Sequence, residues 1–383
     1  MCGAALAAGP DFDWPAQLGG AARRSTALDQ PADPTSLAWR WPDQGDGIGE
    51  PCDGLVVGWG IVYATSRRGA VQAIDQYTGQ PLWREDLGQP LAGPPILWGT
   101  ELLVGTTPGL VYVLDARRGG ALARHDLSCE LLSTPARAGT TVFVCARDSD
   151  GPCVAAFEVR AGVAESKWRT RGGPGRPFER MRAPAAAAGD TVVVGDMGGA
   201  VTALEAGTGE VRWQAMMDGG SPIYGAPTIA QDRAFAANRD GRCSCFELRS
   251  GRRAGWVATR VEAPVYSSLT VAGSLAYLTT HSGFVYEFDV RTGGEFAETE
   301  VPRCSGWNSA LTTGVATRSR LFFGSGSGHV YSYHRQAKWA IMMTKVDSPV
   351  FAPPAVSDGA VYVVTQRGIV HALREWRTVD ERQ

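Results

Sequence analysis

The chain has 383 residues and a formal net charge of −2, so a general basic field that would attract nucleic acid or an anionic membrane is absent. No run of about 18 apolar residues occurs, which excludes a transmembrane helix. Eight cysteines are scattered without a CxxC pair or zinc-ligand spacing, so we expect buried thiols rather than a disulfide framework or a metal site.

The first segment, residues 1–35, is rich in Ala, Gly, Asp and Pro and shows no periodicity, so we predict an N-terminal tail. Met1-Cys2-Gly3 carries no apolar signal segment, which favours a cytoplasmic protein. A processed lipoprotein also begins at a cysteine. The alternative is therefore an exported lipoprotein with Cys2 at its mature N-terminus.

From residue 36 onward the chain repeats a short pattern. An acidic residue is followed four positions later by glycine in six pairs: Asp75/Gly79, Asp115/Gly119, Glu158/Gly162, Glu205/Gly209, Glu247/Gly251 and Asp289/Gly293. We interpret each pair as a turn in which the carboxylate accepts backbone N–H bonds and the glycine supplies a positive φ. Two further repeats have His334 and Arg374 in the acidic slot.

Apolar residues and glycines keep step with this slot, which recurs every 40 to 47 residues. Each repeat predicts four short strands; in the sixth, the first three are Ser267–Val271, Leu275–Thr279 and Phe284–Phe288. Four strands at this period are typical of a propeller blade. We therefore predict an all-β fold, a single eight-bladed β-propeller over residues 36–377, followed by a C-terminal tail at 378–383.

The two ends of the ring are predicted to meet. The last repeat, from about Val346, has only three strands before the chain ends. Ser36–Arg40 resembles the fourth strand of the other repeats, so we expect it to complete the last blade and close the ring. The outer strands carry aromatic residues that we expect to wedge between neighbouring blades: Trp83, Trp168, Trp213, Trp256, Phe296 and Trp339.

The segments AVQAIDQYTGQPLW at 70–83 and AVTALEAGTGEVRW at 200–213 resemble the pyrroloquinoline-quinone-type propeller repeat. That family contains quinoprotein dehydrogenases, which bind the quinone with calcium, and non-enzymatic propellers such as the outer-membrane assembly lipoprotein of Gram-negative bacteria. The dehydrogenases share adjacent cysteines, calcium ligands and long insertions, whereas here Cys243-Ser244-Cys245 is the nearest approach to such a pair. The resemblance therefore implies a non-dehydrogenase member, and we expect no cofactor.

In a propeller, the segments before the inner strands and the turns between second and third strands meet at one face of the central channel. We predict a ligand-binding funnel there, made of Arg180, Arg182, Tyr224, Arg239, Tyr266, Trp307, Asn308, Phe351 and Arg367. Aromatic walls with guanidinium forks suit an anionic or aromatic small molecule. The alternative is that Met181, Tyr224 and Trp307 plug the channel while the charged turns simply meet water.

Catalytic and metal-binding motifs such as HExxH and GxSxG are missing. The candidates for acid–base chemistry are His281, in a turn at the funnel, Tyr266, and Asp240 in the neighbouring blade. A surface histidine is the simpler interpretation. Asp148–Gly151 and Asn238–Gly241 resemble the start of calcium loops but lack the remaining ligands, so we predict turns and no metal.

Three functions remain open. The first is a non-catalytic binding or scaffold propeller, a monomer with a small molecule or a protein partner at its face and no nucleic acid or membrane span. The second is a cofactor-independent enzyme of a small-molecule biosynthetic pathway, because a pure scaffold needs no uneven distribution of aromatic residues and arginines among blades. The third, a quinone-dependent dehydrogenase, is the least favoured.

Overall fold

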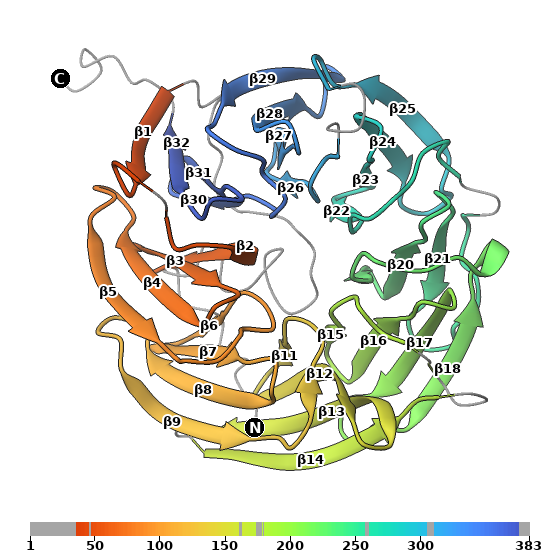
Figure 1. The fold of residues 1–383 in the computed structure, drawn as a ribbon. Coiled ribbons are helices and arrows are strands. Elements are labelled where there is room, and N and C mark those ends of the chain that lie inside the picture. Colours follow the sequence, from red (N-terminus) through yellow and green to blue (C-terminus); the bar gives the residue numbers. More distant parts are fainter. Residues whose placement is uncertain are drawn as a thin grey trace, which may run out of the picture.

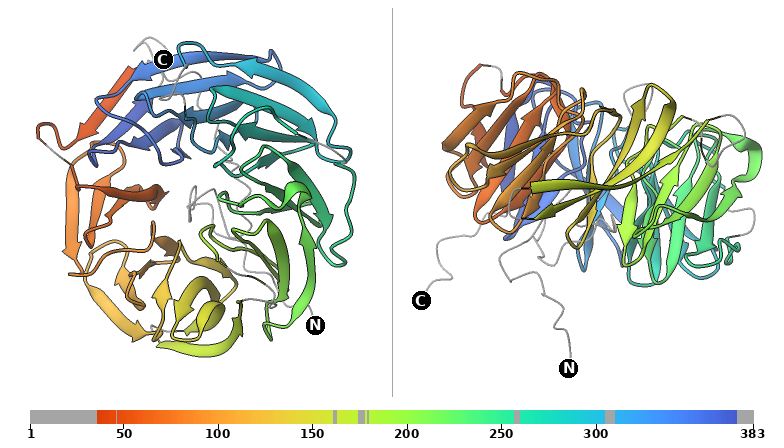
Figure 2. Two further views of the ribbon diagram at one scale, coloured as in Figure 1. Left: turned by 45° about the vertical axis from the view of Figure 1, so that its right-hand side comes forward. Right: turned by 90° about the horizontal axis from the view of Figure 1, so that it is seen from below.

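Eight β-sheets surround a central axis in the computed structural model, which confirms the predicted eight-bladed propeller (Figure 1). The structure describes residues 36–374 except 46, 161–162, 174–177, 179, 257–259 and 305–309, so the predicted tails at 1–35 and 378–383 lie outside the described residues. Seen from below, the blades stand side by side in one ring-shaped layer (Figure 2). Among the described residues no helix is long and apolar enough to cross a membrane; a 3-10 turn lies at Asp218–Gly220.

The first four blades follow one another along the chain. Blade 1 contains β2 (Pro51–Gly58), β3 (Ile61–Ser66), β4 (Ala70–Asp75) and β5 (Pro81–Asp86). Blade 2 contains β6 (Ile96–Trp98), β7 (Glu101–Gly105), β8 (Leu110–Asp115) and β9 (Ala121–Asp126). Blade 3 contains β10 (Glu130–Leu131), β11 (Ala136–Ala138), β12 (Thr141–Asp148), β13 (Gly151–Arg160) and β14 (Val163–Arg171). Blade 4 contains β15 (Ala186–Ala188), β16 (Thr191–Gly195), β17 (Ala200–Glu205) and β18 (Val211–Met216).

The last four blades complete the ring. Blade 5 contains β19 (Thr228–Ala230), β20 (Arg233–Ala237) and β21 (Cys243–Glu247). Blade 6 contains β22 (Thr270–Ala272), β23 (Leu275–Thr279), β24 (Phe284–Asp289) and β25 (Glu295–Glu300). Blade 7 contains β26 (Val315–Ala316), β27 (Arg320–Gly324), β28 (His329–His334) and β29 (Trp339–Lys345). Blade 8 contains β30 (Ala355–Ser357), β31 (Ala360–Val364), β32 (Val370–Arg374) and, from the other end of the chain, β1 (Ser36–Trp41).

Two blades depart from the predicted four strands. Blade 3 has a fifth strand, since β10 and β11 both pair with β12. In blade 5 only three strands are assigned among the described residues. The segment beyond β21 still follows its edge, with isolated bridges that join Phe246 to Arg253 and Arg242 to Arg260. Both departures affect strands at the edge of a sheet and leave the eight blades of the ring in place.

The N-terminal strand closes the ring as predicted. β1 pairs antiparallel with β32, and the Ser36 hydroxyl donates to the carbonyl of Arg374 at 2.8 Å. Blade 8 is then joined to blade 1, because Trp39 Nε1 donates to the carbonyl of Gln76 at 3.0 Å. The Gln76 amide in turn donates to Ser357 Oγ at 2.9 Å. These bonds link residues near opposite ends of the chain and leave no gap in the ring.

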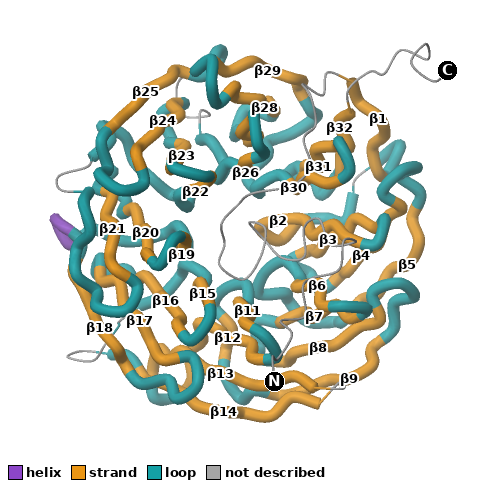
Figure 3. The backbone as a smooth tube through the Cα atoms, turned by 180° about the vertical axis from the view of Figure 1, so that it is seen from behind, coloured by secondary structure: helices purple, strands orange, loops and turns teal. Residues whose placement is uncertain are grey.

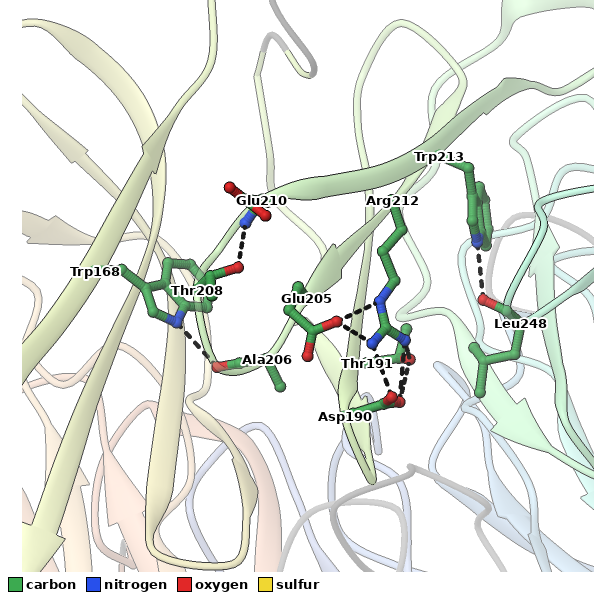
Figure 4. A network of polar contacts seen from close by, with 10 residues as sticks. All are labelled: Trp168, Asp190, Thr191, Glu205, Ala206, Thr208, Glu210, Arg212, Trp213 and Leu248. Atoms are coloured by element: carbon green, nitrogen blue, oxygen red, sulfur yellow. Dashed lines mark hydrogen bonds and ion pairs between the residues drawn. The ribbon is translucent and has the colours of Figure 1, made fainter.

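The same tryptophan contact joins most other blades, which confirms the predicted wedge for four of the named aromatic residues. Figure 4 shows two of these contacts, those of Trp168 and Trp213. Each ring packs on the next blade while its indole N–H donates to a backbone carbonyl there, which satisfies the polar group of a mostly buried residue. The Nε1–O distances are 3.1 Å from Trp83 to Ala116, 2.9 Å from Trp168 to Ala206, 2.8 Å from Trp213 to Leu248 and 2.9 Å from Trp256 to Val290.

The acid–glycine turn supplies the surface on which each tryptophan rests. In blade 1 a carboxylate oxygen of Asp75 accepts the backbone N–H groups of Tyr77 and Thr78 at 3.0 and 2.8 Å, as predicted. Gly79 then adopts a φ of 74°. A Cβ added to this glycine would lie 2.7 Å from the ring of Trp39. The glycine is therefore required twice, for its positive φ and for the close approach of an indole from the preceding blade.

Gly209→Ala is expected to lower the free energy of unfolding by about 2–3 kcal/mol, because the added methyl group would overlap the Trp168 ring at a residue with a φ of 76°. Gly207 in the same turn is the matched control, since the nearest atom to an added Cβ there is 4.0 Å away. Gly207→Ala should change the unfolding free energy by less than about 0.5 kcal/mol. Urea unfolding compares the two variants, and equal losses would rule out the close-packing explanation.

Two predicted wedge residues need correction. Trp339 is 40% exposed and stacks on His334, with ring centroids 5.7 Å apart, so its predicted role was wrong. The side chain of Phe296 lies outside the described residues. The position on β25 that corresponds to the wedge is Ala297, because it pairs with Glu287 just as Trp213 pairs with Ala203 in blade 4.

A buried ion pair replaces the wedge between blades 6 and 7. Lys338 stands where other turns have glycine, with a φ of 59°, and its backbone N–H donates to the carbonyl of His334 at 2.8 Å. Its ammonium group pairs with Glu287, which is fully buried and also accepts the Tyr333 hydroxyl at 2.9 Å. A lysine on blade 7 thus takes the place of the large side chain that Ala297 does not provide.

Candidate binding site in the central cavity

A cavity of about 970 Å³ lies at the centre of the ring, at the face where the inner strands begin. The inner strands β2, β6, β11, β15, β19, β22, β26 and β30 surround this centre (Figure 3). Every blade contributes lining residues, from Arg67 in blade 1 to Phe351 before the first strand of blade 8. Met181, one of the three residues of the predicted plug, is only 2% exposed and packs into the core between blades 3 and 4, whereas Tyr224 lines the cavity.

The cavity brings together part of the predicted site. The lining includes Arg180, Arg182, Tyr224, Tyr266, His281 and Phe351. Arg239, Asp240 and Arg367 are exposed and lie outside the lining. Trp307 and Asn308 lie outside the described residues. The proposed acid–base pair of His281 with Asp240 therefore has only one of its two members at the cavity.

The aromatic wall of the cavity is a row of three rings from blades 5 and 6. Tyr224 and Tyr266 precede the inner strands of neighbouring blades, and their ring centroids lie 5.0 Å apart. His281 lies 4.5 Å from Tyr266, and burial lowers the pKa of its imidazole below the usual value. Gly225 permits this arrangement, since a Cβ there would lie 2.3 Å from the carbonyl oxygen of Ser267. The two tyrosines and the histidine therefore form a continuous aromatic wall, in which neighbouring rings are tilted by 36° and 51°.

The positively charged part of the cavity wall comes from blades 1, 3 and 4. Arg67, Arg147, Arg180 and Arg182 line the cavity, and the acidic lining residue is Glu130, which pairs with Arg147 at 2.7 Å. The lining therefore carries an excess of positive charge, although the whole chain has a net charge of −2. A concave surface of one sign concentrates its field in the cavity. The geometry suits an anion.

Hydroxyl groups line the cavity as well, and two of them form hydrogen bonds within a blade or between blades. Ser267 Oγ donates to the carbonyl of Thr279 at 2.6 Å, and Thr313 Oγ1 accepts the backbone N–H of Ser268 at 2.9 Å. Ser133 differs, because its buried Oγ has no hydrogen-bond partner among the described residues.

Sequence reasoning missed the contribution of blade 3. This part of the lining consists of Glu130, Ser133 and Arg147. The additional strand β10 brings Glu130 beside Arg147, which lies on β12. The one available signal was the calcium-like turn at Asp148. Its carboxylate is bound by Arg169 and Arg171 at 2.8 and 2.7 Å, which lowers the pKa of Asp148. Two arginines thus hold this turn.

The cysteines do not take part in the site. The six that the structure describes are buried, and none lines the cavity. Burial raises the pKa of the Cys153, Cys243 and Cys245 thiols to about 12, so these side chains are protonated and poorly reactive at neutral pH.

Comparison with known proteins identifies the family. The sequence model described as "Outer membrane protein assembly factor BamB" matches residues 67–299, more than half of the chain. The chain belongs to this family. BamB of Burkholderia pseudomallei is 28% identical over 326 residues, which cover 82% of this chain and 81% of the relative. BamB of Shewanella oneidensis is 26% identical over 352 residues, which cover 85% of each chain.

Solved structures agree on the fold. BamB from Moraxella catarrhalis superposes with a TM-score of 0.68 at 20% identity, covering 88% of this chain and 99% of that chain. A quinohemoprotein alcohol dehydrogenase from Comamonas testosteroni gives a TM-score of 0.70 at 16% identity, covering 97% of this chain and 82% of the dehydrogenase. At such identities the likeness concerns the fold alone. The family match confirms the predicted resemblance to a non-dehydrogenase member.

The calcium-bound quinone of the dehydrogenase branch does not fit the described residues. A group of three or more His, Cys, Asp or Glu side chains that could hold a metal ion is not found within the described part of the chain. The sequence also lacks adjacent cysteines. The cavity of this BamB-family chain offers arginines, tyrosines and hydroxyls instead, which are groups for binding.

Proposed function

We propose that the chain is a non-catalytic scaffold in the assembly of outer membrane proteins, and that it binds its ligand or protein partner at the face where the central cavity opens. The observation that carries this proposal is the family match, since the relatives are named as outer membrane protein assembly factors. The cavity supports it, because tyrosine and arginine are the side chains enriched at binding hot spots.

The same relatives favour the exported alternative over the cytoplasmic location predicted from the sequence. Cys2, on which the lipoprotein alternative rests, lies outside the described residues. The monomeric state also stays a prediction. We propose an envelope location in which the ring is free to hold a partner at its open face.

An enzymatic role has one observation in its favour. The ring of His281 lies 4.5 Å from that of Tyr266 in the cavity, and burial lowers the pKa of its imidazole, which favours the neutral form that can accept a proton. The carboxylate proposed to assist it, Asp240, is outside the lining. We therefore keep a cofactor-independent enzyme as the second candidate.

Deletion of the gene tests the scaffold proposal. Cells that lack the chain should contain less folded outer membrane protein, and the loss should be restored by the parent chain. His281→Gln should restore it equally well, because a scaffold does not need a base. An unchanged outer membrane in the deletion strain would contradict the proposal, and failure of His281→Gln alone would favour the enzyme.

A further inference from the structure

The two chemistries of the cavity come from different blades. Arginines on blades 3 and 4 form one part of the wall, and the neighbouring rings of Tyr224, Tyr266 and His281 on blades 5 and 6 form the next part. A ligand that contacts both parts must carry negative charge at one side and a flat apolar group at the other. The ligand class is therefore more specific than an anion: it combines a negative charge with a flat apolar group.

Arg180 and Arg182 lie two residues apart, and both line the cavity. They flank Met181 in the sequence. The Met181 side chain is buried, whereas Arg180 and Arg182 are exposed at the cavity. Residues two apart on an extended backbone lie about 6.6 Å from each other. The described residues supply neither guanidinium with an ion-pair or hydrogen-bond partner. Two arginines that are two residues apart offer a pair of guanidinium groups to an extended peptide that has one residue between two acids.

The openness of the wall favours a peptide over an enclosed small molecule. Tyr266 and Phe351 remain 39% and 57% exposed at the cavity. Small-molecule sites cover about 70–90% of their ligand, which requires walls that close around it. Half-exposed tyrosine and phenylalanine beside arginines are instead typical of surfaces that bind a segment of another protein.

We propose that the cavity binds an extended acidic segment of a protein partner. Two carboxylates one residue apart pair with Arg180 and Arg182, and an aromatic side chain of the segment packs on Tyr224 and Tyr266. This inference rests on the proposed scaffold function and names the chemistry of its partner. Since side chains alternate along an extended chain, a segment of the pattern acid–aromatic–acid–aromatic presents its carboxylates to one side and its rings to the other.

A fluorescent peptide of the sequence GDFDFG tests this proposal on the full chain by fluorescence anisotropy. We expect saturable binding that weakens about tenfold with Arg180→Gln or Arg182→Gln, since each removes one charge-assisted pair. Tyr266→Ala should weaken binding by a similar factor. Arg118→Gln is the matched control, because Arg118 is exposed in the turn between β8 and β9 and is not among the cavity residues. It should bind as tightly as the parent.

Two control peptides separate this recognition from simple charge attraction. GNFNFG lacks the carboxylates, and GDDFFG keeps the charge but changes the spacing. We expect both to bind at least tenfold more weakly than GDFDFG. Equal binding of GDFDFG and GDDFFG, or unchanged affinity in the Arg180 and Arg182 variants, would overturn the proposal. Circular dichroism and Arg→Lys variants, which keep the charge, exclude misfolding as the cause of a loss.

Failure of the acidic-segment proposal can be distinguished from failure of the proposed scaffold function. If a partner co-purifies from the host but GDFDFG does not bind, the scaffold stands and the acidic-segment proposal falls. If GDFDFG binds as described while the deletion strain assembles its outer membrane normally, the cavity chemistry stands and the proposed function falls.

Discussion

Glu287→Ala is expected to lower the free energy of unfolding by about 3 kcal/mol. The substitution leaves the ammonium group of Lys338 and the hydroxyl of Tyr333 without their shared acceptor at the interface of blades 6 and 7. Breaking a buried ion pair costs about 3–5 kcal/mol, and we take the lower end because the Lys338 side chain is 36% exposed and can reach water. Chemical unfolding measures the loss.

A triple variant separates the physical cause from general damage. Glu287→Ala, Ala297→Trp and Lys338→Gly together recreate the tryptophan–glycine contact that joins blades 4 and 5. The triple variant should recover most of the stability that Glu287→Ala loses, whereas Lys338→Gly alone should be at least as damaging, because it leaves a buried carboxylate unpaired. A triple variant no more stable than Glu287→Ala would show that Lys338 does not stand in for the indole.

Trp39→Ala is expected to cost about 3–5 kcal/mol of unfolding free energy, since it removes a large side chain that is only 8% exposed. The ring packs near Tyr362, with centroids 5.9 Å apart, and its N–H bonds the carbonyl of Gln76 in blade 1. The loss should appear first as faster hydrogen exchange in β30, β31 and β32, whose blade depends on the N-terminal strand.

Leu37→Ala is the control for Trp39→Ala. Leu37 lies on the same strand and is 50% exposed, so its truncation should change the unfolding free energy by less than about 0.5 kcal/mol. Similar losses in both variants would mean that β1 contributes through strand pairing alone and that the indole adds nothing to ring closure.

The repeat made the fold predictable from the sequence. Six copies of one turn and eight copies of one apolar pattern predict the same local structure along the chain, so the two repeats that lack the turn, at His334 and Arg374, do not obscure the fold. The exchange of Trp and Gly for Glu287 and Lys338 was not predictable. It couples residues 51 apart in sequence that meet only when two blades pack, and Phe296, next to Ala297, suggests from the sequence that the aromatic position is filled.

The candidate site was only partly predictable for a similar reason. Tyr224 and Tyr266 could be placed at the cavity because residues before inner strands must face the channel. Arg239 and Arg367 were assigned from turns, and a turn fixes the face of the ring without bringing its side chains to the cavity. Arg147 was missed because it reaches the lining through β10, a strand that the repeat does not contain.

Native mass spectrometry of the chain purified from its own host, followed by mild denaturation, tests the central claim most directly. A scaffold that holds a partner at its open face should appear as a complex with another protein, and the double variant Arg180→Gln, Arg182→Gln should appear without it. A small molecule released on denaturation, and lost on Tyr266→Ala, would contradict the claim and make the cavity the site of an enzyme.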